Sequence, residues 1–274
     1  MCNCCKIKFP TSKAEICYVQ AGFCNICYNM MITGCVGTID GLLVVIRCPS
    51  MKASDNNPSS YYNGHYCCHG LNVQAICDSS SCFTFFAIAA AGKSSVQAAV
   101  DQISLLTALN CLPVGSYIVG DAAFTLTDKC ITPFTGLQQW IASKNSLNYS
   151  LSQLRIRIEV AFGLLITKWH LLKKPLFVSL SVRSEVLECI SWLHNYCIDV
   201  RLQDLSEDKA EIIPLETSPL GWRYLPRFEK LEPSVHGASQ VCDAILGMVS
   251  QNRLGRPPYD NECHQQELHD ITMM

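Results

Sequence analysis

The chain lacks the features that mark a secreted or membrane-spanning protein. Its longest apolar stretch, Phe83 to Ala91, is far too short to cross a bilayer. The first residues, Met1 to Lys8, contain no apolar core of a signal peptide, so we expect an intracellular protein. The 18 cysteines should then be reduced, and most of them should behave as small buried hydrophobes.

An excess of positive charge is also missing. The net charge is -2, whereas a DNA-binding protein is usually basic, at least locally. This composition argues against tight, autonomous binding to DNA. The 274 residues, 49% of them hydrophobic, are sufficient for one sizeable core with appended segments.

A complete zinc-binding motif is likewise absent. Cys24-Asn-Ile-Cys27 has the spacing of half a zinc site, but no second half is evident. A cysteine-rich zinc protein is therefore an alternative that the sequence does little to support.

Strand-like and helix-like segments are what the chain does contain. Strands are expected at 36–47, 72–77, 83–90 and 117–120, with a hairpin turn at 78–82. Helices are expected at 95–109, 148–169, 184–201 and near 241–249, and a loop at 133–147. Three antiparallel strands, a helix, a further strand and more helices predict an α/β fold with a mixed sheet and helices on both faces.

Two acidic residues have positions that suit a metal site. Asp121 ends a strand-like run, and Glu159 lies beside the apolar face of the helix at 148–169. That face consists of Leu151, Leu154, Ile158, Phe162, Leu165 and Trp169. Taken singly, such an Asp is usually a turn residue and such a Glu is usually solvated. Arg155, four residues before Glu159, could form a simple helical ion pair with it.

Several short motifs follow one another in a distinctive order. They are Gly37-Thr-Ile-Asp40-Gly41, Tyr61-Tyr-Asn-Gly-His-Tyr66, Asn72-Val-Gln-Ala-Ile-Cys-Asp78, Gly120-Asp121-Ala-Ala-Phe124, Thr132-Pro133-Phe134, Leu151 to Gly163, and Leu193-His194-Asn195. Over roughly residues 30 to 200, this order resembles the Harbinger/IS5-type transposase nuclease family of DDE superfamily endonucleases. The resemblance implies an RNase H-like fold, that is, a mixed sheet flanked by helices.

The resemblance also implies an activity, divalent-metal-dependent cleavage of phosphodiester bonds in DNA. Asp40, Asp121 and Glu159 would be both the catalytic residues and the ligands of Mg²⁺ or Mn²⁺. Lys93 and Arg155 are candidates for contacts with phosphate. DNA binding would be weak without a separate DNA-binding protein, and the location would be the nucleus. No membrane partner is expected, and the oligomeric state is left open.

The same resemblance suggests three parts of the chain. Residues 1–32 would be a cysteine-rich linker remnant, 33–203 the nuclease domain, and 204–274 a partly irregular C-terminal extension. His194 lies on an apolar helix, where we expect a hydrogen-bonded core histidine. Tyr66 lies in a segment that could contact nucleic acid, although a structural loop is the preferred interpretation.

Departures from the family pattern keep an alternative open. Relatives show a Gly-Lys-Thr-Asn-Asp-like run after the third strand, whereas this chain has Gly92-Lys-Ser-Ser-Val96 and so lacks the acid. Leu42-Leu43 also stands where relatives have a Thr-His pair. The resemblance would place a DNA-binding domain before the motifs, and we expect none in this chain. The alternative is a catalytically decayed transposon remnant, or a domesticated module that binds proteins.

Overall fold

A six-stranded mixed sheet forms the centre of the protein. The computed structural model describes residues 7–27, 32–54, 57–91, 105–207 and 239–251. The strands are β1 (Cys35–Val45), β2 (Tyr62–Asn63), β3 (Cys68–Cys77), β4 (Phe83–Ala91), β5 (Tyr117–Val119) and β6 (Cys130–Ile131). The principal helices are α1 (Lys13–Ile26), α3 (Leu105–Asn110), α4 (Ala142–Lys168), α5 (Leu180–Glu207) and α6 (Gln240–Gln251).

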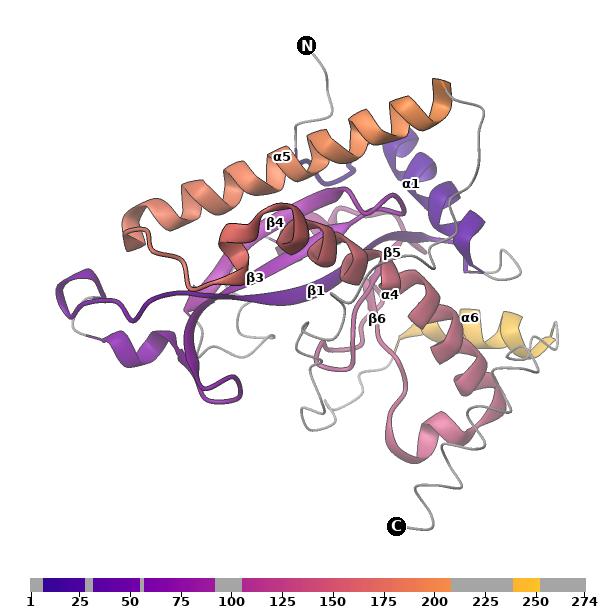
Figure 1. Ribbon diagram of the computed structural model, residues 1–274. Helices are drawn as coiled ribbons and strands as arrows, with labels where there is room; N and C mark the ends of the chain where they lie inside the picture. Colours follow the sequence, from indigo (N-terminus) through magenta and orange to yellow (C-terminus); the bar gives the residue numbers. More distant parts are fainter. Residues whose placement is uncertain (1–6, 28–31, 55–56, 92–104, 208–238, 252–274) are drawn as a thin grey trace, which may run out of the picture.

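The strand order is β2-β3-β1-β5-β6, with β4 also paired to β3. β1 pairs antiparallel with β3 and parallel with β5, and β6 extends the parallel part. β3 and β4 are joined by the expected hairpin turn, where the Asp78 amide donates to the Cys82 carbonyl at 2.9 Å. The expected α/β architecture, a mixed sheet flanked by helices, is therefore confirmed (Figure 1).

Helices α4 and α5 cover one face of the sheet, as Figure 1 shows. In that layer, Leu42 and Val44 of β1 lie in one buried cluster with Ile158 and Phe162 of α4 and Leu187 of α5. These residues recur at the strand period of two and at helical steps of four, which is why the two kinds of element share one apolar interface. The sheet and α4 thus meet through the face that the helical pattern predicts.

The opposite face of β1 belongs to a second buried cluster. Ile39 lies there with Leu105 and Leu109 of α3 and Ile16 of α1. A third cluster, with members such as Phe23, joins the rest of α1 to β5, the N-terminal half of α4, and α6. α1 and α6 therefore share buried clusters with the sheet and with α4.

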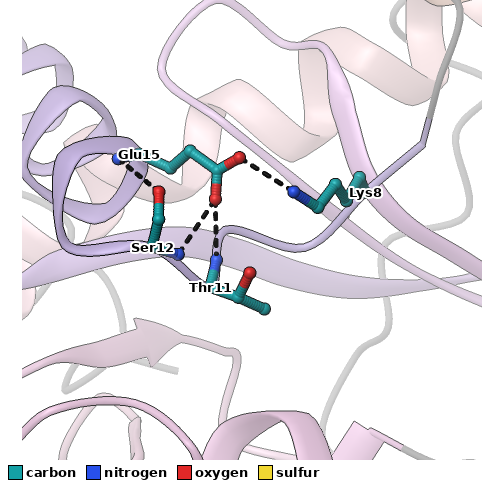
Figure 2. A network of polar contacts seen from close by, with 4 residues as sticks. All are labelled: Lys8, Thr11, Ser12 and Glu15. Carbon is teal, nitrogen blue, oxygen red and sulfur yellow. Dashed lines mark hydrogen bonds and ion pairs between the residues drawn. The ribbon is translucent and has the colours of Figure 1, made fainter.

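A capping box begins α1 (Figure 2). The Ser12 hydroxyl accepts from the Glu15 amide at 3.2 Å, and the Glu15 carboxylate accepts from the Ser12 and Thr11 amides and from Lys8. These bonds lower the pKa of Glu15 to about 2, and the bond from the Ser12 amide contributes most. The pattern Ser-x-x-Glu before an apolar helix is a signal for such a start, and residues 12–15 carry it.

The starts of α4 and β3 differ from expectation. α4 begins at Ala142 rather than Asn148, and residues 136–140 form a 3-10 helix, so the predicted loop at 133–147 is wrong over much of its length. Leu147 is fully buried, and this tertiary contact holds the extra helical turns. β3 starts at Cys68, four residues earlier than expected, because its first residues pair with β2.

Of the remaining predicted helices, two are confirmed and one lies partly outside the described residues. The helices at 184–201 and 241–249 are confirmed as parts of α5 and α6. Of the helix expected at 95–109, residues 95–104 lie outside the described residues. Leu193 of α5 is 40% exposed, whereas His194 is buried, as predicted, and bonds the Ser81 carbonyl at 3.0 Å.

The cysteines that the structure describes are free but mostly not buried. Among the fourteen cysteines that the structure describes, only Cys27, Cys35, Cys77, Cys130 and Cys242 are buried, so that expectation is wrong for this part of the chain. Among the residues that the structure describes, no helix is long and apolar enough to cross a membrane.

Two asparagine side chains fasten the long helices to backbone elsewhere. Asn195 of α5 accepts from the Phe83 amide at 2.7 Å and donates to the Phe83 carbonyl at 2.8 Å. Asn148 of α4 makes the same pair of bonds with Phe134, both at 2.8 Å. Each clamp satisfies one donor and one acceptor that burial would otherwise leave without a partner.

Replacing Asn195 with alanine should therefore destabilise the protein by about 2–4 kcal/mol, because two buried backbone groups at Phe83 lose their partners. Urea denaturation of the full chain measures this loss. Tyr196→Ala, on the neighbouring residue that is 46% exposed, is the control and should cost less. Equal losses in the two variants would contradict the clamp.

Candidate carboxylate site

Asp40 lies on the face of β1 that α4 covers. Side chains alternate along a strand, so Asp40 points to the same side as Leu42 and Val44, which pack against α4. Its side chain is only 14% exposed. One carboxylate oxygen accepts a hydrogen bond from the Gly41 amide at 2.7 Å, and the other faces Arg155.

Asp121 follows β5 at the level of Asp40. The parallel register sets Thr38 opposite Val119, and two further residues along each chain lead to Asp40 and Asp121. The Asp121 carboxylate accepts from the Ala123 amide at 3.0 Å, which fixes it in the turn after the strand.

Gly120 allows that turn to fold back closely. A Cβ atom on this residue would lie 2.9 Å from the Phe124 ring and 3.2 Å from Ile39. A glycine at this position is therefore required by packing around the acid, since any larger residue would push the turn away.

α4 brings Arg155 and Glu159 to the edge of the same region. Leu154 and Ile158, one residue before each of them, are fully buried and hold the helix on the sheet. The guanidinium Nη2 atom of Arg155 lies 3.8 Å from a carboxylate oxygen of Asp40 and 3.8 Å from one of Glu159. The helical ion pair considered from the sequence is thus present, and Asp40 shares it.

Negative charge is concentrated around Asp40. Burial first, and then the charge of Asp121, raise its pKa from 3.8 to about 7. The positive charge of Arg155 and the Gly41 hydrogen bond oppose that rise, and Glu159 adds to it. Each of the three predicted acids therefore contributes to one electrostatic environment.

The three acids supply the oxygen donors and the negative charge that a divalent cation prefers. Carboxylate oxygens are the donors that Mg²⁺ and Mn²⁺ prefer. A positive group, the Arg155 guanidinium, already stands between Asp40 and Glu159. As the side chains lie, no group of three or more His, Cys, Asp or Glu among the described residues is arranged to hold a metal ion. This finding also covers the cysteines of the zinc alternative that the structure describes.

Tyr66 is a neighbour of the site whose proximity the sequence did not reveal. Burial and then the charge of Asp40 raise the pKa of its phenol to about 12, so the ring lies near the carboxylate. Asn63 shapes this loop by accepting from the His65 and Tyr66 amides. The expected structural loop is present. The only signal in the sequence that Tyr66 belongs near the acids was the family-like order of its motif. Lys93 and Val96 lie outside the described residues.

Comparison with known proteins gives one match. A family model described as DDE superfamily endonuclease matches residues 39–195, which is more than half of the chain and includes Asp40, Asp121 and Glu159. No curated protein and no solved structure matches the chain.

The raised pKa of Asp40 predicts a pH-dependent stability. The folded state holds the proton more tightly than the unfolded state, so the Asp40 contribution to stability falls as pH rises from about 4 through about 7. Without metal, Asp40→Asn should be more stable than the wild type at pH 8, by on the order of 2–4 kcal/mol, and should nearly equal it at pH 4. Urea denaturation in EDTA at both pH values tests this expectation.

The matched control is Glu188→Gln, on an exposed residue of α5. The difference between this variant and the wild type should be nearly the same at both pH values. An Asp40→Asn difference that is equally independent of pH would show that Asp40 is not the group responsible.

Proposed function

Because this chain belongs to the DDE superfamily endonuclease family, we propose that it hydrolyses phosphodiester bonds in DNA through Asp40, Asp121 and Glu159. The observation that carries the proposal is the gathering of these acids from β1, from the end of β5 and from α4. The charges of Asp121 and Glu159 both raise the pKa of Asp40. Like charges assembled in a partly buried place are costly, and such places are often functional sites.

Mg²⁺ or Mn²⁺ held by these three carboxylates would activate the attacking oxygen and stabilise the leaving oxygen of an in-line displacement. The protein itself provides the rigid support. Asp40 sits on the central strand, and Asp121 is fixed by the Ala123 amide. Glu159, with a side chain that is 48% exposed, is the acid most open to solvent and so to an incoming DNA strand.

The finer assignments rest on the order of the motifs. A Harbinger/IS5-type transposase that acts in the nucleus is the subtype we propose. The net charge of this chain, -2, favours its recruitment to DNA by a separate DNA-binding protein. In this proposal Lys93 and Arg155 are the groups that meet phosphate.

Thermal unfolding with Mn²⁺ tests the carboxylate site. An ion at a hundred times its dissociation constant adds about 2.7 kcal/mol to the stability of the folded state, which should raise the melting temperature of the wild type. Asp121→Asn should lose this shift, since it removes the charge. The variant keeps an oxygen that can accept from the Ala123 amide, so the turn should be preserved. Glu188→Gln, on the exposed face of α5, should keep it.

Plasmid nicking by the same three proteins in Mn²⁺ then tests the chemistry. We expect cleavage by the wild type and by Glu188→Gln, and none by Asp121→Asn. A wild type that shows neither a melting shift nor nicking would favour the decayed or domesticated protein-binding module, for which the missing acid at Val96 is the motivating feature.

A further inference from the structure

Arg155 occupies the place between two of the proposed metal ligands. Its guanidinium Nη2 atom is equidistant, at 3.8 Å, from Asp40 and Glu159. Hydrogen bonds from nitrogen to oxygen are formed at 2.7–3.2 Å as a rule. Arg155 is therefore not clamped to either carboxylate, and it acts on them through its charge.

The surroundings of the guanidinium allow it to move. The Arg155 side chain is 21% exposed and that of Glu159 is 48% exposed, so solvent reaches one side of the pair. A long arginine stem can keep its apolar part against the helix while its head group changes position. The Arg155 Nε atom is buried and has no hydrogen-bond partner among the described residues, so no bond from that atom holds the present rotamer.

At the proposed site, a divalent cation and the guanidinium would compete for the same carboxylate oxygens. An ion bound between Asp40 and Glu159 would repel a positive head group only a few ångströms away, and it would use the oxygens that the guanidinium now faces. In the metal-free protein, in contrast, the guanidinium reduces the repulsion between the carboxylates. Arg155 thus stabilises the carboxylates in the metal-free protein and opposes an ion in the metal-bound protein.

We propose that Arg155 is the resident countercharge of this site, and that a divalent ion binds by displacing its guanidinium from between Asp40 and Glu159. The inference rests on the proposed metal-dependent function and adds a positioning residue to it. The displaced head group stays tethered to α4 beside the carboxylates. There it can pair with an anionic phosphodiester, for which a guanidinium is well suited.

Binding of Mn²⁺ itself, followed by the electron paramagnetic resonance of the free ion at pH 8 and fixed salt, tests the proposal without any assay of cleavage. Arg155→Gln should bind Mn²⁺ about tenfold more tightly than the wild type, since it removes the competing charge. Arg155→Lys should stay near the wild type because it keeps the charge. The matched control is Arg157→Gln, the same change on the same helix at a residue without an ion pair among the described residues, and it should also stay near the wild type.

A second measurement observes the Arg155 side chain of the unaltered protein directly. The ¹⁵N resonance of Arg155 Nε, assigned by its loss in Arg155→Lys, should shift on addition of Mg²⁺. The shift should be absent in Asp121→Asn.

The outcomes separate the two proposals. If the wild type binds Mn²⁺ but Arg155→Gln binds equally well or more weakly, or if the Nε resonance does not respond to Mg²⁺, the displacement model is wrong and the metal site stands. If no protein in the series binds Mn²⁺, both the site and the displacement are overturned. Tighter binding by Arg155→Gln together with a responding Nε resonance supports displacement.

Discussion

The parallel pairing of β1 with β5 is the constraint on which the candidate site depends. Through this pairing, an acid in the middle of one strand and an acid just beyond the end of another reach the same level of the sheet. β1 also pairs with β3 on its other side, so its position is fixed from both edges. Asp40 therefore cannot move along the sheet without disturbing two ladders of hydrogen bonds. α4 then has only to cross this strand to add Glu159 and Arg155.

Gathering the acids has an electrostatic cost that the protein reduces locally. Burial and the charge of Asp121 hold the pKa of Asp40 near neutrality, and Arg155 offsets part of the repulsion. A structure selected only for stability has no need of such an arrangement, whereas a site that binds cations or handles phosphates does. The electrostatics thus agree with the family match over residues 39–195.

The supports of this site lie in buried polar contacts rather than in the acids themselves. The Asn148 clamp fixes the N-terminal half of α4 on the Phe134 backbone, and the Asn195 clamp fixes α5 on the start of β4. His194 adds a bond from α5 to the hairpin between β3 and β4. Together they fix α4 and α5 to backbone elsewhere in the fold, and a carboxylate site needs such support because its ligand distances must be held closely.

The amino-acid sequence by itself determined the kinds of element and their order. Strand-like apolar runs identified β1 and β4, and the helical period identified the buried face of α4, because both signals are local. The same signals misplaced the start of α4, because long-range packing decides which turns are buried. The sequence also indicated the three acids by motif order. Only the tertiary structure decided that Arg155 stands between Asp40 and Glu159 and that Asp121 charges the same environment, since strand register and helix crossing set distances between residues far apart in the chain.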